Sequence, residues 1–472
     1  MHAATDSASS GPAAMPPGAD ALLARLEQLE DFQTQASAAV DQVVSALLEL
    51  KQASADKAAV DALQAKVKEL EQALSIERAG RDLAQVSRMH PKTRSAVFVG
   101  TTYLGCNVKY AFLAARERMV QLGMQVWWLP YNEAQQAQVE ALGGPCLPAG
   151  HANWTPEHLH AVLSAAVVVT SDHLLNPNPF AAALLAGARH VQLWHGVSIK
   201  EIGLRNLPAG RALGPHLAKV LATCGPYARM VGTAAEGEAE WRRWFSFANY
   251  APIGYPRNDV LYRDPTAADL ANVDLDTLGL AQGARHRGKR VFLYAPTFRD
   301  ADRGRWLLAA GLPRVAEALH KAGHLLTVNL HPVEQPLIAQ LAPHLPGVQF
   351  VAPRTDIYPL LASTSALITD YSSLMFDYLH LQRPVLLFRP DHASYTAQSR
   401  RLFDDKLSAL PGPLVDKADA LSKLLLAPRM GQDAVHEHAR TQLLRQWFDH
   451  HDGDSAQRLM QVLADELALS GV

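Results

Sequence analysis

The residues best suited to chemistry follow a short apolar run that stops at Asp370-Tyr371-Ser372-Ser373. A helical pattern comes next, so two serine hydroxyls and several unpaired backbone N–H groups are expected where a helix begins. Such a helix start favours anions, because its N–H groups point outward and the helix dipole attracts negative charge. On its own the segment favours an ordinary N-cap, since Ser and Asp are common capping residues. Phosphate binding is the alternative that other segments must support.

Two histidines also follow apolar runs that are typical of buried strands. His195 precedes Gly196, whose backbone can approach a ligand closely, and His331 precedes Pro332, which fixes the direction of the chain. A histidine can remove a proton from an attacking hydroxyl at neutral pH. Taken alone, His195 fits a histidine bonded to a turn carbonyl equally well.

Two further segments carry arginines that could meet phosphate oxygens. Thr297 and Arg299 follow the predicted strand at 290–294, and a guanidinium fork suits phosphate. By itself this segment favours a capped loop with a surface arginine. A turn shaped by Gly and Pro at residues 254–259 holds Arg257 between the two halves of the chain.

Together these groups predict a site for phosphoryl transfer. A histidine would deprotonate an acceptor hydroxyl, while a helix start and an arginine would hold a diphosphate and stabilise the charge that develops. No spacing of His, Asp or Glu resembles a metal-ligand set, so neither a metal nor a cofactor is expected.

Composition excludes several classes of protein. The 472 residues include 44 Lys and Arg and 46 Asp and Glu, a net charge of −2, which makes nucleic acid a poor candidate partner. Cys106, Cys146 and Cys224 are too far apart for a disulfide framework and fit a reducing cytoplasm. No apolar run reaches 18 residues, so no transmembrane helix is predicted, although peripheral membrane contact stays open.

The elements that position these groups alternate between apolar strands and helices. Strands are predicted at 95–100, 126–130, 165–170, 191–194, 290–294, 325–330, 366–369 and 384–388, with a pause in the alternation over 208–250. Two such series predict an α/β, GT-B-like fold of two Rossmann-like domains facing a cleft, where ligands bind at the carboxyl ends of strands. The predicted boundaries are 1–20 (disordered tail), 21–90 (helical coiled coil), 91–252 and 286–440 (Rossmann-like domains), 253–285 (interdomain segment) and 441–472 (C-terminal helices).

The segment at 21–88 has no proline and carries apolar residues at coiled-coil spacing. The two halves of this seam are out of register near residues 53–57, which indicates either a stammer in one helix or a turn between two antiparallel helices. We expect homo-oligomerisation through this coiled coil. The alternative is a helical hairpin folded onto the rest of the chain.

These segments resemble the family of CDP-glycerol glycerophosphotransferases of the teichoic-acid polymerase type. The matching stretches occur in the order of that family, at 194–196, 254–259, 294–300, 330–332 and 368–384. The last stretch is the most specific, whereas His-Pro or Gly-Tyr-Pro alone would be weak. The likeness spans about 192–388, and residues 1–90 lie outside it.

The resemblance implies transfer of glycerol phosphate from CDP-glycerol to a hydroxyl, with release of CMP, in synthesis of a teichoic-acid-like or capsular polymer. It makes His195 the general base in an acceptor domain (91–252) and His331 a second essential histidine in a CDP-donor domain (286–440). The substrate-binding positions it implies are Gly196, Arg257, Asn258, Thr297, Arg299, Asp300, Asp370, Tyr371, Ser372, Ser373 and Asp377. The implied acceptor is a glycan or polyol phosphate, lipid-linked, which would place the chain at the inner face of the membrane.

Three alternatives remain at this point. CDP-ribitol could replace CDP-glycerol in a slightly larger pocket. A nucleotide-sugar glycosyltransferase or epimerase could use the same fold, because fold alone does not define function. An inactive scaffold could use the coiled coil, but His195 and His331 argue against it.

Overall fold

The computed structural model describes residues 57–121, 123–174, 176–205, 221–299, 303–398, 410–430 and 433–472. The chain divides into two compact units, Met1–Asp82 and Leu83–Val472. The predicted tail at 1–20, the first half of the predicted coiled coil and most of the step near 53–57 lie outside the described residues. The described part of the first unit is helical, as part of α2 (Lys57–Met89). Leu70 and Ile76 on this helix are 47% and 40% exposed, and self-association stays a prediction.

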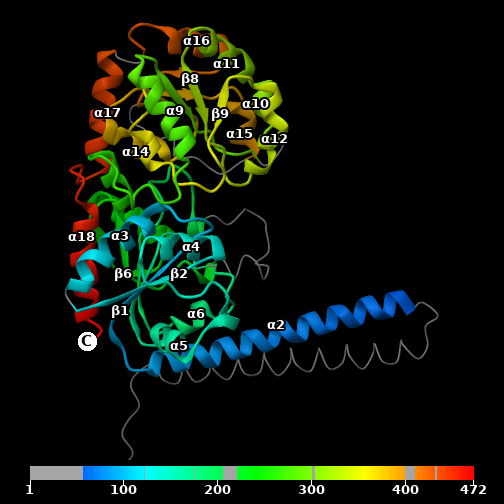
Figure 1. Cartoon of the computed structure of the whole chain (residues 1–472), viewed down its shortest axis with the longest axis vertical. Coiled ribbons are helices and arrows are strands. Elements are labelled where there is room, and N and C mark those ends of the chain that lie inside the picture. Colours follow the sequence, from blue (N-terminus) through cyan, green and yellow to red (C-terminus); the bar gives the residue numbers. More distant parts are fainter. Residues whose placement is uncertain are drawn as a thin grey trace, which may run out of the picture. The chain divides into compact units, whose positions relative to one another are not determined.

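The N-terminal half of the second unit is built on a six-stranded parallel sheet with the order β2-β1-β3-β4-β5-β6 (Figure 1). Its strands are β1 (Thr93–Val99), β2 (Gln125–Leu129), β3 (Ala165–Thr170), β4 (Arg189–Gln192), β5 (Tyr227–Gly232) and β6 (Phe247–Pro252). Its helices are α3 (Cys106–Gln121), α4 (Glu133–Ala141), α5 (Pro156–Leu163), α6 (Ala181–Leu184) and α8 (Glu238–Trp244). The order of the strands reverses between β1 and β3.

The C-terminal half has a second six-stranded parallel sheet with the order β12-β11-β10-β7-β8-β9. Its strands are β7 (Val291–Tyr294), β8 (Leu325–Val328), β9 (Val348–Phe350), β10 (Ala366–Thr369), β11 (Val385–Phe388) and β12 (Leu414–Val415). Its helices are α9 (Leu275–His286), α10 (Trp306–Ala309), α11 (Leu312–Lys321), α12 (Ile338–Leu341), α13 (Tyr358–Leu361), α14 (Leu374–Tyr378), α15 (His392–Gln398) and α16 (Ala418–Leu426). The order of the strands reverses between β7 and β10, where a Rossmann-type sheet binds its ligand.

Both sheets are covered on two faces, as the continuous apolar strands predict. Along β1, Ala96 and Phe98 join a core with α3, whereas Val97 and Val99 join a core with α5 and α6. This alternation follows from the period of two in a strand. The prediction of an α/β fold with two Rossmann-like sheets is confirmed.

The C-terminal helices α17 (Ala434–Trp447) and α18 (Ser455–Ala468) connect the two halves. Leu443 and Leu444 of α17 lie in the core beneath α14, whereas α18 contributes Leu459 and Leu463 to the core of the N-terminal sheet. The carboxylate of Asp259 accepts hydrogen bonds from the first N–H groups of α18, Ser455 N at 3.0 Å and Ala456 N at 2.8 Å. The turn at 254–259 is therefore held against the start of α18.

The predicted pause over 208–250 is wrong, because β5 and most of β6 lie within it. These strands have no continuous apolar run: β5 contains Arg229, which pairs with the buried Glu466 of α18 at 2.7 Å, and β6 exposes Asn249 at the sheet edge. The short strands β9 and β12 were also absent from the sequence prediction. Among the described residues, no helix has both the length and the apolar character that crossing a membrane requires.

Candidate active site

A cavity of about 300 Å³ lies between loops that follow strands of both sheets. We call it the histidine cavity. Its lining consists of Trp194, His195, Gly196, Val197, Ser198, Ile199, Lys200, Ile202, Pro296, Thr297, Phe298, His331, Tyr371, Ser372 and Ser373. The loops after β7 and β10 flank the reversal of strand order in the C-terminal sheet, so the cavity lies where the topology predicts a ligand.

His195 is held in a defined tautomer. Its ring stacks on the Trp194 indole with centroids 4.3 Å apart, and its Nδ1 lies 3.1 Å from the backbone oxygen of Ser171. Because a carbonyl oxygen can only accept, Nδ1 of the neutral ring carries the proton and Nε2 keeps its lone pair. The side chain is 43% exposed, and Asp172 Oδ1 lies 3.9 Å from Nδ1. His195 can therefore accept a proton at Nε2.

His331 has the opposite tautomer. The backbone N–H of Val333 donates to its Nδ1 at 3.3 Å, so the proton of the neutral ring is on Nε2. Its ring lies 4.5 Å from that of Phe298, measured between centroids. The two histidines thus differ in chemistry: His195 presents an acceptor, and His331 presents a donor suited to an anionic oxygen.

The turn at 370–373 has a fixed backbone. Asp370 Oδ1 accepts from Thr297 N at 2.8 Å and from Tyr371 N at 2.5 Å, which joins the loops after β7 and β10. Ser372 Oγ accepts from Leu374 N at 3.3 Å, whereas Ser373, at the N-cap position of α14, makes no side-chain capping bond. Ser372 therefore caps the start of α14, while both Ser372 and Ser373 line the histidine cavity.

Gly196 brings the loop after β4 against this turn. Its φ is +146°, and a Cβ at this position would lie 2.9 Å from Ser373 Oγ and 3.3 Å from Arg257 Nη2. We expect Gly196→Ala to lower the kcat/KM of a reaction in this cavity by about 100-fold or more, because a shift of about 1 Å at a reacting centre has that effect. Steady-state kinetics with CDP-glycerol, the donor expected from the sequence, measure it.

The matched control is Gly279→Ala on α9, where a Cβ would meet nothing within 4 Å and φ is not positive. It should leave kcat/KM unchanged. Wild-type kcat/KM in Gly196→Ala would contradict the close approach of the two loops.

A buried ion pair lies beneath the turn. Arg257 Nη2 donates to Asp377 Oδ2 at 2.7 Å, and Asp377 also accepts from Asn258 Nδ2 at 3.0 Å and from the Tyr358 hydroxyl at 2.8 Å. Burial opposes the charge of Arg257, but Asp377 together with Tyr358, Cys106 and Tyr255 holds the pKa of Arg257 above its ordinary value. This cluster joins the turn at 254–259 to α14.

Arg299 is also buried among carboxylates. Its Nη1 lies 2.9 Å from Asp370 Oδ2, and its Nε donates to Asp391 Oδ2 at 2.6 Å. The guanidinium lies 4.2 Å from the Trp306 ring centroid and 4.5 Å from that of Tyr395. Burial alone would lower the pKa of Arg299, but Asp391 and Asp370 raise it above its ordinary value.

A second cavity of about 170 Å³ adjoins the first and shares Pro296, His331 and Ser372 with it. We call it the adjacent cavity. It is also lined by Arg257, with Asn329, Gln335, Arg354 and Thr355 as further polar residues. Nε of Arg257 is buried and has no hydrogen-bond partner among the described atoms.

The predicted site residues therefore fall into three groups. The histidine cavity brings together His195, Gly196, Thr297, His331, Tyr371, Ser372 and Ser373, and Arg257 lines the adjacent cavity. Asn258, Arg299, Asp370 and Asp377 are buried and are not among the described residues that line either cavity. Asp300 lies outside the described residues. The sequence prediction omitted Lys200, although the residue lies five positions after His195 in the same loop.

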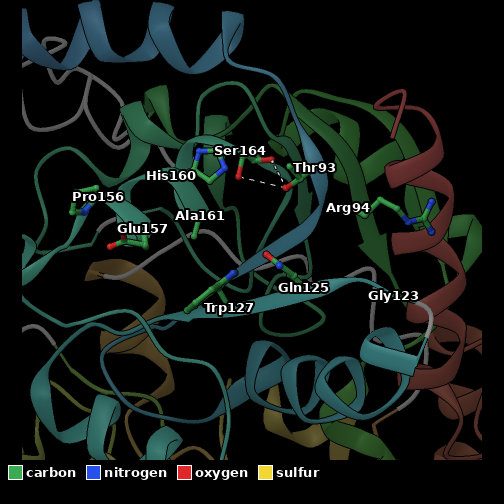
Figure 2. Close-up of a pocket in the computed structure, with 10 residues that line it drawn as sticks. All are labelled: Thr93, Arg94, Gly123, Gln125, Trp127, Pro156, Glu157, His160, Ala161 and Ser164. Atoms are coloured by element: carbon green, nitrogen blue, oxygen red, sulfur yellow. Dashed lines mark hydrogen bonds between the residues drawn. The ribbon is translucent and has the colours of Figure 1, made fainter.

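A larger cavity of about 710 Å³ lies elsewhere, at the amino ends of β1 and β2. Figure 2 shows Gln125 and Trp127 of β2 on one side of it and His160 and Ala161 of α5 on the other. None of the predicted site residues is among the described residues that line it. Ligands of such sheets bind at the carboxyl ends of strands, so the histidine cavity is the better candidate. The described residues also hold no cluster of three or more His, Cys, Asp or Glu side chains that could bind a metal.

The fold and the cavity are those of a GT-B-like protein in which His195 follows a strand of one sheet and the turn at 370–373 follows a strand of the other. The family model for CDP-glycerol:poly(glycerophosphate) glycerophosphotransferase matches residues 83–465, and the chain belongs to this family.

Individual relatives have low sequence identity to this chain. The chain is 26% identical over 294 residues to the teichoic acid glycerol-phosphate transferase of Staphylococcus aureus, covering 58% of this chain and 70% of that protein. It is 25% identical over 279 residues to the teichoic acid ribitol-phosphate polymerase TarL of the same organism, covering 58% of this chain and 47% of that protein. The fold is similar to that of the wall teichoic acid polymerase TagF in a structure with CDPG, with a TM-score of 0.62 and 20% identity over 85% of this chain and 98% of that chain.

Proposed function

We propose that the chain transfers glycerol phosphate from CDP-glycerol to a hydroxyl of an acceptor and releases CMP. The observation that carries this proposal is the hydrogen bond from His195 Nδ1 to Ser171 O, 3.1 Å long, which leaves Nε2 as a proton acceptor. The same cavity contains Ser372, Ser373 and His331, a suitable seat for a diphosphate. A base and an anion seat on facing loops are what phosphoryl transfer to a hydroxyl requires.

The reaction balances with these residues. His195 Nε2 takes the proton of the acceptor hydroxyl as its oxygen attacks the phosphorus of the glycerol phosphate. A new P–O bond forms to the acceptor, and the bond from that phosphorus to the oxygen bridging it to CMP breaks. CMP leaves with the electron pair of the broken bond, and donors at Ser372, Ser373 and His331 Nε2 stabilise its charge. Asp172 stabilises the imidazolium of His195 until the proton is lost to water.

The buried predicted residues support the site from beneath. Arg299 holds Asp370, whose carboxylate fixes Thr297 N and the start of the turn at 370–373, which we call the serine turn. Asp377, which also accepts a hydrogen bond from Asn258, holds Arg257 at the adjacent cavity. The role proposed for Asn258, Arg299, Asp370 and Asp377 is to position the turn. Arg257, which lines the adjacent cavity, is the arginine placed to reach a ligand.

The polyol and the acceptor form the finer part of the proposal. The relatives named above carry glycerol phosphate or ribitol phosphate in their names at nearly the same identity, so the favoured donor, CDP-glycerol, rests on the family that matches the chain. We further propose a lipid-linked glycan or polyol-phosphate acceptor at the inner face of the membrane, in synthesis of a teichoic-acid-like or capsular polymer. The proposed oligomer would form through the segment at 21–90.

The test compares CDP-glycerol, CDP-ribitol and several UDP-sugars as donors and measures nucleotide release with a polyol-phosphate acceptor. We expect CMP release, with a kcat/KM for CDP-glycerol about 10-fold or more above that for CDP-ribitol, as pocket size can discriminate. A preference for CDP-ribitol would change the polyol that we assign and leave the proposed type of reaction unchanged. UDP release without CMP release would overturn the proposed function in favour of a nucleotide-sugar enzyme.

A further inference from the structure

The donor proposed for the histidine cavity requires a cation on the wall of that cavity. A donor diphosphate is negatively charged, and the leaving CMP gains charge during transfer, so a cation must face it. The two predicted arginines are not among the described residues that line this cavity: Arg257 pairs with Asp377 at 2.7 Å, and Arg299 lies between Asp370 at 2.9 Å and Asp391 at 2.6 Å. Arg389 donates to the backbone oxygen of Asp370 at 3.2 Å and is not among the described lining residues.

Lys200 is the one lysine or arginine among the described residues that line the histidine cavity. It extends from the loop after β4 to the C-terminal half, where its Nζ lies 3.3 Å from Thr297 Oγ1 and 5.8 Å from the Tyr395 ring centroid. Thr297 is tied to the serine turn through Asp370. The ammonium group is thus placed beside the loop that the donor phosphates must meet.

The backbone of Lys200 is fixed locally. Ser198 Oγ accepts from Lys200 N at 3.1 Å and donates to Lys200 O at 2.8 Å, and Ile199 is 3% exposed. A flexible side chain on a fixed backbone can exchange its bond to a hydroxyl for a stronger bond to phosphate, because charge-assisted hydrogen bonds are about twice as strong as neutral ones.

We propose that Lys200 binds the diphosphate of the donor and then the phosphate of the leaving CMP. This rests on the proposed function and deepens it by adding a ligand from the opposite half of the cleft. Lys200 transfers no proton in the reaction: its ammonium group stays charged and stabilises the oxygen that leaves with the electron pair. The loop after β4 thereby carries both the base, His195, and a side chain that binds the donor.

The test measures CMP release and, by calorimetry, the binding of CMP and of cytidine to the full-length protein. Lys200→Gln should lower kcat/KM for CDP-glycerol about 100-fold. It should weaken CMP binding about 10-fold and leave cytidine binding unchanged, because cytidine lacks the phosphate. Lys200→Arg should recover most of both losses. The control is Lys321→Gln on α11, an exposed lysine paired with Glu317 at 2.5 Å, which should match the wild type.

The outcomes separate the two claims. Equal CMP affinity in Lys200→Gln and the wild type, or equal losses for CMP and cytidine, would overturn the role of Lys200 while turnover by the wild type keeps the proposed function. A wild type that neither binds CMP nor releases it from a CDP-polyol would overturn both. Failure of Lys200→Arg to recover any CMP affinity would likewise count against a phosphate contact.

Discussion

Replacement of His195 by Asn is expected to lower the rate of CMP release about 1,000-fold, within the range that a general base contributes. An Asn amide keeps an N–H that can donate to the Ser171 carbonyl, so the loop should hold its position. The lost function is the lone pair at Nε2. Single-turnover release of CMP from CDP-glycerol measures the chemical step, and calorimetry with CMP measures donor-site binding.

The binding of CMP and the midpoint of thermal unfolding should stay near wild type in His195→Asn, and in His195→Ala as well. The matched control is His160→Asn on α5, a histidine that lines the cavity at the amino ends of the strands. It should retain full turnover. Unimpaired turnover in His195→Asn would reject the assignment of the base.

Replacement of Asp377 by Ala is expected to reduce the free energy of unfolding by about 3–5 kcal/mol. The substitution leaves the guanidinium of Arg257 buried without its carboxylate, with Arg257 only 4% exposed. The Asn258 amide and the Tyr358 hydroxyl also lose their acceptor. Urea unfolding followed by circular dichroism measures the change.

The control for this effect is Asp419→Ala. Asp419 pairs with Arg314 at 3.8 Å, but both side chains are 73% exposed, so water screens the interaction. The expected change in the free energy of unfolding is within about 0.5 kcal/mol. If Asp377→Ala were as mild as Asp419→Ala, the buried pair would not be what holds the turn at 254–259 to α14.

The sequence predicted the central strands because each is a short apolar run buried on both faces. Strands β1, β3, β10 and β11 are of this kind, and the ends of β4, β7, β8 and β10 located the loops of the site. Strand β5 was missed because its Arg229 is compensated by Glu466, more than 200 residues away. Such a partner is created by the fold, so no local pattern can indicate that an arginine lies within a strand.

The prediction of the site was limited in the same way, by interaction partners that are distant in the sequence. His195, His331 and the serines, which line one cavity, could be predicted as site candidates because strand ends and turns are local features. Arg299 and Arg257 were predicted as phosphate ligands from their residue type. Their carboxylate partners Asp391 and Asp377 lie 92 and 120 residues away along the chain. Lys200 was passed over because a lysine in a loop is ordinary until the fold places it beside Thr297.

The most direct test of the central claim is the stoichiometry of one reaction. The protein is incubated with CDP-glycerol and a polyol-phosphate acceptor. The CMP released is quantified, and the gain in mass of the acceptor is measured by mass spectrometry. We predict one CMP released for each glycerol phosphate added through a new phosphodiester, with both products absent in His195→Asn. CMP formed without any gain of glycerol phosphate by the acceptor, or nucleotide released only from UDP-sugars, would contradict it.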